Sequence, residues 1–247
     1  LLYLINSPNN PSGTVCQNLK EIAEVAKKYN LIILSDEIYS HLTFNKQYKS
    51  ISNFYPEGTI VSSGLSKWCG AGGWRLGFFA IPNQLKELRN SLKILCSESF
   101  SSVSAPVQYA AIEAYTGDYS SYIEKVKKIL SFVGNYVYEN LKSNTINIRK
   151  PEGGFYLFPE FTNAKFSSSS KMCADILNKT GVALLPGSDF GLNKNKMLAR
   201  LSYTDFDGFN FLSNTSGSKK LDDADIKKYA PNIVDGILSL KEWSNSL

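Results

Sequence analysis

The sequence predicts an α/β protein, in which a large domain with a mainly parallel sheet flanked by helices precedes a smaller α+β domain. In the first half, short apolar segments alternate with segments whose apolar residues recur at helical spacing. This pattern is typical of a parallel sheet covered by helices on both faces. From about residue 119 the pattern changes to one long amphipathic helix followed by shorter elements. We therefore expect domains at residues 1–118 and 119–247.

Strands and helices alternate in the first half. Continuous apolar runs predict strands at 1–5, 31–34 and 60–61, and a fourth at 76–81 that ends at Pro82. Apolar residues at helical spacing predict helices over 17–29 and 85–95. Such sheets bind ligands beyond the carboxyl ends of their strands. Asn10, Asp36 and Lys67 each follow a predicted strand, so we expect them at one edge of the sheet.

The second half begins with a predicted helix over 122–141. Short strands are expected at 146–148, 155–158 and 182–185, and helices at 171–179 and 224–243. The polar segment 210–220 is predicted to be a mobile loop without a catalytic role.

The composition excludes several classes of function. The 247 residues are 43% hydrophobic and 20% charged, as in ordinary globular proteins. The net charge of +5 comes from scattered lysines, which argues against a nucleic-acid surface, and no apolar stretch reaches the length of a membrane span. Cys16, Cys69, Cys96 and Cys173 have neither metal-site nor disulfide-framework spacing and are expected to be free thiols in a reducing compartment. His41 is the only histidine, so we expect no catalytic triad and no metal site.

Residues 64–77 (GLSKWCGAGGWRLG) are the most informative segment of the chain. Lys67 is a possible covalent nucleophile, and Arg75 is suited to binding phosphate in a bidentate way. Five glycines lie around them and allow a ligand to approach the backbone closely. The two residues alone would prove nothing, because the chain has 23 lysines and most lysines are solvated surface groups.

The whole segment resembles the pyridoxal-phosphate lysine signature of the class I/II aminotransferases. Three further segments carry the resemblance in the expected order: 6–13 (NSPNNPSG), 35–39 (SDEIY) and 200–203 (RLSY). The resemblance covers nearly the whole chain and implies the fold of the pyridoxal-phosphate-dependent transferases, with 1–118 as part of the large, cofactor-binding domain. The family's N-terminal half has no counterpart here, and residues 1–5 are a buried-strand pattern without an initiator Met. We therefore expect the chain to be the C-terminal portion of a longer enzyme.

The resemblance also implies roles for single residues. Lys67 would form the Schiff base with the cofactor and then carry a proton as base and acid. Asp36 would pair with the pyridine nitrogen; the alternative is a helix cap. Asn10 and Tyr39 would lie near the 3′ oxygen of the cofactor, with Asn10 also near the substrate carboxylate. In isolation they could equally be a turn residue and an aromatic core residue.

Two arginines and a serine complete the implied site. Ser66 and Arg75 would hold the cofactor phosphate. Arg200, in an apolar strand-like context, would bind the α-carboxylate of the substrate; the alternative is a buried structural ion pair. Residues 153–156 (GGFY) resemble the segment of the smaller domain that approaches the substrate, where they would contribute shape.

The implied activity is amino-group exchange between an L-amino acid and a 2-oxo acid, as in aspartate aminotransferases, in a cytoplasmic homodimer that binds neither nucleic acid nor membrane. A carbon–sulfur lyase, an aminocyclopropane-carboxylate synthase and a non-catalytic fragment or binding module remain alternatives. Some aspartate-specific members bind the second carboxylate with an arginine from the neighbouring subunit. The comparable region, 96–106, has no arginine. Either that residue lies elsewhere or the substrate is not strictly dicarboxylic.

Overall fold

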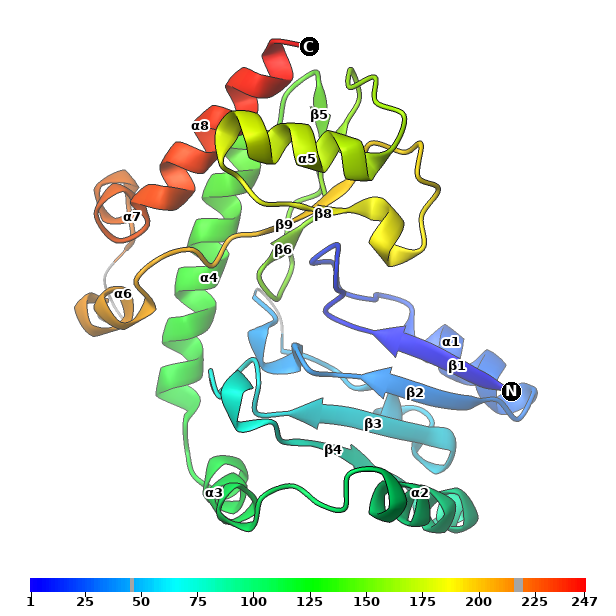
Figure 1. Cartoon of the computed structure of the whole chain (residues 1–247). Coiled ribbons are helices and arrows are strands. Elements are labelled where there is room, and N and C mark those ends of the chain that lie inside the picture. Colours follow the sequence, from blue (N-terminus) through cyan, green and yellow to red (C-terminus); the bar gives the residue numbers. More distant parts are fainter. Residues whose placement is uncertain (45–46, 216–219) are drawn as a thin grey trace. The chain divides into compact units, whose positions relative to one another are not determined.

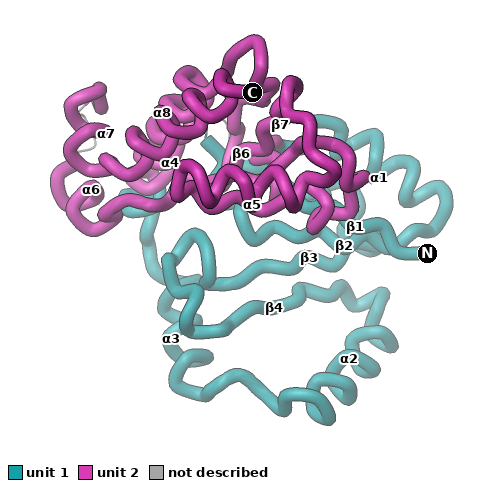
Figure 2. Tube along the Cα trace, turned by 45° about the horizontal axis from the view of Figure 1, so that its top comes forward, with its two compact units in different colours: residues 1–8, 15–123 teal, residues 9–14, 124–247 magenta. Residues whose placement is uncertain are grey.

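The computed structural model describes residues 1–44, 47–215 and 220–247. The chain divides into two compact units, coloured separately in Figure 2. The first unit comprises residues 1–8 and 15–123, and the second comprises 9–14 and 124–247. The short segment 9–14 thus belongs with the C-terminal half, although both of its neighbours in sequence belong to the first unit. The sequence-based domain boundary at 118/119 stays a prediction.

A four-stranded sheet forms the first unit (Figure 1), with strands β1 (Leu2–Asn6), β2 (Ile32–Asp36), β3 (Thr59–Gly64) and β4 (Gly77–Ala80) in that order. β1, β2 and β3 are parallel, as predicted, whereas β4 is antiparallel to β3. The segment between β3 and β4 forms turns and the 3-10 helix η4 (Gly72–Trp74) in place of an α-helix. A parallel return would need a longer crossover, so the chain reverses direction here.

Helix α1 (Leu19–Lys28) covers one face of this sheet. Its buried face, with Leu19, Ala23 and Ala26, packs in one core cluster with Ile5 of β1 and Ile33 of β2. On the other face of β1, Leu2 and Leu4 are 59% and 60% exposed. The predicted cover on both faces is therefore incomplete at β1.

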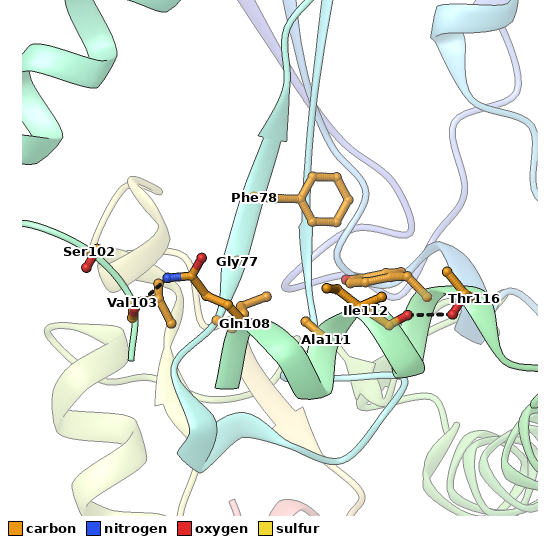
Figure 3. A pocket seen from close by; sticks show the side chains of 10 residues that line it. Gly77, Phe78, Ser102, Val103, Gln108, Ala111, Ile112 and Thr116 are labelled. Atoms are coloured by element: carbon orange, nitrogen blue, oxygen red, sulfur yellow. Dashed lines mark hydrogen bonds between the residues drawn. The ribbon is translucent and has the colours of Figure 1, made fainter. Parts of the chain in front are cut away.

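Two further helices, α2 (Lys86–Ser99) and α3 (Ala105–Thr116), follow β4. The apolar residues at helical spacing predicted α2 but not its environment, because none of its residues is buried. α3 was not predicted. Side chains of β4, of α3 and of the segment before α3 line an apolar pocket of about 580 Å³. Phe78 and Ile112 are among them (Figure 3). None of the predicted site residues lines this pocket.

In the second unit, the buried side of α4 (Ser120–Leu141) includes Val133, Val137 and Leu141, at the four-residue spacing of one helical face. Two small sheets accompany it. One has the antiparallel order β6-β9-β8, and the other pairs β5 with β7. Their bounds are β5 (Ile146–Asn147), β6 (Tyr156–Leu157), β7 (Glu160–Phe161), β8 (Leu185–Pro186) and β9 (Ala199–Ser202). Of the strand predicted at 182–185, only Leu185 lies in an observed strand, β8.

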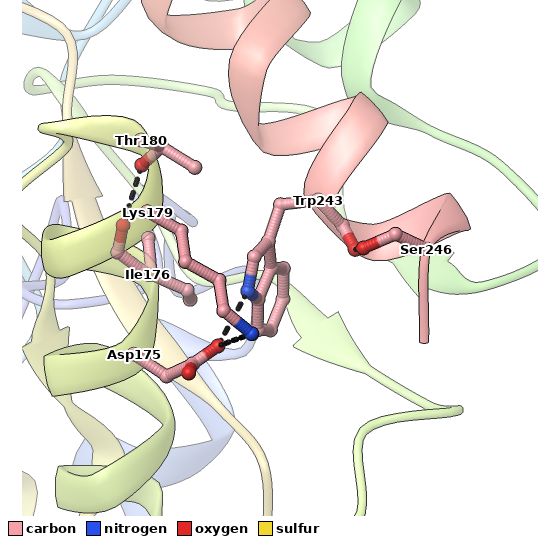
Figure 4. Close-up of polar contacts among 6 residues, drawn as sticks. All are labelled: Asp175, Ile176, Lys179, Thr180, Trp243 and Ser246. Carbon is pink, nitrogen blue, oxygen red and sulfur yellow. Dashed lines mark hydrogen bonds and ion pairs between the residues drawn. The ribbon is translucent and has the colours of Figure 1, made fainter.

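Helices α5 (Ser169–Thr180) and α8 (Pro231–Asn245) meet at Trp243, which is only 3% exposed (Figure 4). The indole Nε1 donates a hydrogen bond of 2.8 Å to Asp175 Oδ2. Lys179 Nζ lies 3.1 Å from the same oxygen. This buried indole with a satisfied donor links the two helices by a polar contact.

Two predictions for the C-terminal region were wrong. The helix expected at 224–243 is two helices, α7 (Asp223–Tyr229) and α8, because Pro231 has no amide hydrogen to continue the ladder across Ala230. The segment expected to be a loop begins within the helix α6 (Gly208–Asn214), whose Phe211 is buried. Burial of this side chain outweighed the polar composition of the segment. Residues 216–219 lie outside the described residues.

Short 3-10 helices complete the chain: η1 (Ser40–Leu42), η2 (Ile51–Asn53), η3 (Pro56–Gly58), η5 (Asn83–Leu85) and η6 (Gly187–Phe190). No helix in the described part of the chain is both long and apolar enough to cross a membrane.

Candidate functional site

The carboxyl ends of the three parallel strands hold one carboxylate in place. Asn6, Asp36 and Ser62 are aligned across β1, β2 and β3. Asn6 Nδ2 donates to Asp36 Oδ2 at 3.1 Å, and Ser62 Oγ donates to Asp36 Oδ1 at 3.4 Å. Asp36 therefore lies at the sheet edge where the sequence predicted it, with both oxygens oriented by neighbouring strands.

The alternative role of Asp36, as a cap, is also present. The backbone N–H of Ile38 donates to Asp36 Oδ1 at 3.3 Å. An ionised carboxylate has about four acceptor positions, so this bond and those from Asn6 and Ser62 leave capacity for a further donor. Asp36 is half-buried, and a ligand could reach it.

Lys67 and Tyr39 lie together in the same unit. Lys67 Nζ is 5.8 Å from the centroid of the Tyr39 ring, within the range of a cation–π contact. Tyr39 is 4% exposed, so its ring is a fixed neighbour of the lysine. The flanking residues Leu65 and Trp68 are buried and anchor the loop on both sides of Lys67.

The only histidine packs beside this loop. The His41 ring stacks on Trp68 with centroids 5.2 Å apart and an interplanar angle of 28°. Burial against this ring lowers the pKa of His41 below its ordinary value of 6.5. The stacking gives His41 a packing partner.

The phosphate-binding candidates, Ser66 and Arg75, lie in the same loop. Arg75 is exposed, and its Nη1 donates to the Gly72 carbonyl at 2.8 Å. Its backbone is left-handed, with φ 55°, at a cost of about 1–2 kcal/mol for a non-glycine residue. Such strain is concentrated at functional sites. Ser66 is half-buried.

Gly64, at the start of the motif, is required by a close approach of two chain segments. A Cβ at this position would lie 2.6 Å from the carbonyl oxygen of Leu76. This glycine lets the two ends of the lysine loop, at β3 and β4, pair directly through Gly64 and Gly77.

The second unit contains the other two candidates, and it brings them together. Arg200, on β9, donates from Nη1 to Asn10 Oδ1 at 2.9 Å. The guanidinium carbon lies 4.4 Å from the centroid of the Tyr156 ring and 5.2 Å from that of Phe190. Tyr156 comes from β6 and Phe190 follows β8, so aromatic rings reach Arg200 from both strands that flank β9.

The structural ion pair considered for Arg200 does not occur among the described residues of its unit. Its partners are instead an amide oxygen and two aromatic rings, which hold the guanidinium without neutralising its charge. This arrangement suits a site for an anionic ligand.

Backbone contacts fix the segment that carries Asn10. The Gly13 carbonyl accepts hydrogen bonds from the N–H groups of Glu152 and Gly153, at 2.8 and 3.1 Å. Gly13 has φ 69°, and a Cβ there would collide with the Tyr156 carbonyl. The glycine pair expected to contribute shape therefore lies against the Asn10 segment.

Three residues at these clusters were missed by sequence reasoning. Asn6 and Ser62 stand at the ends of predicted strands, so the alignment of parallel strands could have indicated them. Phe190 gave no signal, because its approach to Arg200 depends on the pairing of β8 with β9.

The residues of the first unit fit the chemistry of pyridoxal phosphate. A lysine amine suits its aldehyde, a carboxylate oriented on both oxygens suits its ring nitrogen, and an exposed guanidinium suits its phosphate. No group of three or more His, Cys, Asp or Glu residues that could hold a metal ion occurs within residues 1–44, 47–215 and 220–247.

Comparison with known proteins finds aminotransferases that are similar to this chain in sequence and in structure. An aspartate aminotransferase of Bacillus sp. (strain YM-2) is 36% identical over 199 residues, which are 76% of this chain and 50% of that protein. An aspartate aminotransferase of Geobacillus stearothermophilus is 36% identical over 214 residues, 81% of this chain and 52% of that protein. An alanine aminotransferase from Pyrococcus furiosus has a similar structure, with a TM-score of 0.81, 26% identity, and coverage of 100% of this chain and 58% of that one.

The predicted fold class is confirmed by this structural likeness. The chain spans about half the length of the curated relatives it matches. Residues 2–207 match the family described as aminotransferase class I and II, whose members depend on pyridoxal phosphate. The chain belongs to the aminotransferase class I and II family.

Proposed function

We propose that this chain belongs to an aminotransferase, which exchanges an amino group between an L-amino acid and a 2-oxo acid as aspartate aminotransferases do. The observation that carries the proposal is the alignment of Asn6, Asp36 and Ser62, which fixes a carboxylate at the strand ends of the unit that also contains Lys67. Family membership supports the same conclusion.

The residues of the first unit would hold the cofactor and move protons. Bound pyridoxal phosphate supplies an electron sink for the negative charge that develops at the substrate Cα. Lys67 would attach the cofactor through its amine and, once released, take the proton from Cα and deliver it to the cofactor. The Asp36 carboxylate would keep a proton on the ring nitrogen, Tyr39 would donate to the 3′ oxygen, and Ser66 and Arg75 would bind the phosphate.

The residues of the second unit would recognise the substrate. Arg200 has five N–H donors in a planar fork, and Asn10 accepts from one nitrogen only. The opposite edge of the fork can therefore bind a carboxylate in a bidentate way. Asn10, which the resemblance also assigns to the 3′ oxygen of the cofactor, would orient the fork.

The relatives described above are aminotransferases, so the lyase and cyclopropane-carboxylate synthase alternatives are not favoured. The aspartate aminotransferases among them support aspartate-like amino acids as substrates. A homodimer and a cytoplasmic location stay predictions from the resemblance. The four free cysteines support a reducing environment.

Absorbance spectroscopy of the chain mixed with pyridoxal phosphate tests the proposal. We expect a visible band that is absent in Lys67→Ala and kept in Lys93→Ala, an exposed lysine of the same unit. Adding an amino acid should convert the band to the pyridoxamine form and release stoichiometric 2-oxo acid. Release of pyruvate and ammonia without an acceptor would instead indicate a lyase, and no Lys67-dependent band would contradict the proposal.

A further inference from the structure

Glu37 is a buried carboxyl group for which the proposed chemistry has no use. It follows Asp36 directly, yet it is only 7% exposed. Burial raises its pKa above the ordinary value, although several hydrogen bonds to the carboxyl group act in the opposite direction. Burying an ionisable group is costly, and an apolar side chain of similar size would fill this space without that cost. A buried carboxyl group at this position therefore suits a role that depends on directional hydrogen bonds.

Hydrogen bonds from two segments converge on Glu37. Its Oε1 accepts from Ser35 Oγ at 2.9 Å and from Ser50 Oγ at 2.5 Å. The Tyr48 hydroxyl bonds to Glu37 and to Ser35 as well. Ser50 also caps η2 by accepting from the N–H of Ser52. The carboxyl group thus ties the end of β2 to the segment 48–52.

The backbone of Glu37 is fixed on both sides. Its N–H donates to the Ser62 carbonyl of β3 at 2.9 Å, and its carbonyl accepts from the Ser40 N–H at 2.9 Å. The second bond closes a turn that includes Tyr39. Glu37 therefore lies between the two turn residues assigned to the cofactor, Asp36 and Tyr39.

Asp36 and Glu37 bond on opposite sides of the sheet, as successive residues at the end of a strand do. Asp36 contacts Asn6 and Ser62, whereas Glu37 contacts Ser35, its neighbour on the same side of the strand. The hydrogen bonds of the Glu37 side chain on one side of the sheet can thus fix the backbone that orients the Asp36 side chain on the other side.

We propose that Glu37 is a positioning residue for the cofactor: its bonds to Ser35 and Ser50 hold the turn that presents the Asp36 carboxylate and the Tyr39 ring. The inference rests on the proposed function for the identity of the group that Asp36 and Tyr39 contact. In this role Glu37 would touch neither cofactor nor substrate.

Three variants separate this role from simple packing. Glu37→Gln keeps an oxygen acceptor for Ser35 and Ser50, Glu37→Met keeps the volume but removes the acceptor, and Ser50→Ala removes one donor. Glu57→Gln is the matched control, a half-buried acid of the same unit that pairs with Lys27. All are measured for pyridoxal phosphate affinity and for the pH midpoint of the absorbance band of the bound cofactor.

We expect Glu37→Met to weaken cofactor affinity about tenfold and to move the pH midpoint, because the hydrogen bonds from Ser35, Ser50 and Tyr48, of about 1 kcal/mol each, are lost. Ser50→Ala should give a smaller effect of the same direction. Glu37→Gln and Glu57→Gln should stay within about threefold of the parent chain. A lower melting temperature in Glu37→Met with unchanged affinity and midpoint would overturn the proposal.

A cofactor-free measurement keeps this test separate from the proposed function. The Ile38 N–H, which is bonded to Asp36, should exchange with solvent about tenfold faster in Glu37→Met and Ser50→Ala, but not in Glu37→Gln. The amide of Ile60, in β3, is the internal reference. Unchanged Ile38 exchange would overturn the positioning role, whereas faster exchange without any Lys67-dependent band would contradict only the proposed function.

Discussion

The two units hold their candidate binding residues in different ways. In the second unit, Arg200 is already held by Asn10, Tyr156 and Phe190, all from the same unit. In the first unit, Asp36 is held firmly, whereas Arg75 is exposed on a left-handed backbone. A small carboxylate needs one rigid fork, and a larger cofactor needs several groups along a loop. The contrast is consistent with the proposed roles, a preformed carboxylate site in the second unit and several cofactor-binding groups along a loop in the first.

The two units also differ in how completely their sheets are buried. In the second unit the central strand β9 has Ala199 and Leu201 buried. In the first unit, the edge strand β1 exposes Leu2 and Leu4. The second unit therefore covers its main sheet with its own elements, and substitutions in its core should have the larger effect on stability.

The largest expected effect is on the core of the second unit. Trp243→Ala should lower the free energy of unfolding by about 3–5 kcal/mol, because it leaves a cavity beside Phe161 and removes the donor to Asp175. Urea denaturation followed by circular dichroism measures this. Trp74→Ala is the matched control in the first unit, where the indole is 53% exposed, and should change stability by less than about 1 kcal/mol. Similar losses for the two variants would contradict the contrast between the units.

The carboxylate fork is the next largest effect. Arg200→Lys should weaken binding of 2-oxoglutarate to the chain by about 10- to 100-fold, because lysine cannot replace a bidentate, charge-assisted pair. Isothermal titration calorimetry without cofactor is the appropriate measurement. Arg149→Lys, exposed in the same unit, should bind as the parent chain does. Undiminished binding by Arg200→Lys would contradict the proposal that Arg200 binds the carboxylate.

A smaller effect tests whether the anion site is preformed. Phe190→Leu keeps an apolar side chain but removes the ring 5.2 Å from the guanidinium. A cation–π contact that is not fully desolvated contributes about 0.5–1 kcal/mol, so 2-oxoglutarate affinity should fall by about 2- to 5-fold. Phe209→Leu, on an exposed ring of the same unit, is the control. Equal affinities in the two variants would show that the ring does not orient Arg200.

The smallest effect concerns pH and the first unit. Since burial lowers the pKa of His41 below 6.5 in the folded chain, the native state binds this proton less readily than the unfolded state. The stability contributed by neutral His41 is therefore present above pH 6.5 and is lost as the pH falls through the lowered pKa. Proton NMR of this sole histidine should show a midpoint below 6.5, moving upward in Trp68→Leu, which removes the stacked ring. An unchanged midpoint in that variant would contradict the stacking.

The sequence predicted what local pattern controls and missed what long-range pairing controls. Strands β1, β2 and β3 and the residues at their ends, including Asp36 and Lys67, follow from apolar runs and a motif. The reversal at β4, the break before Pro231 and the burial of Phe211 in α6 depend on packing that composition does not reveal. Likewise, Asn10 was linked to Arg200 only through the resemblance. Their hydrogen bond joins residues 190 positions apart.

Lys67, one of 23 lysines, is the residue proposed to attach the cofactor. Borohydride reduction of the chain with pyridoxal phosphate, followed by peptide mass spectrometry, tests it most directly. The account predicts one stoichiometric pyridoxyl group on the peptide that contains Lys67, reduced in amount when Asp36 is changed to Asn. Labelling that is spread over exposed lysines with no enrichment at Lys67 would contradict it.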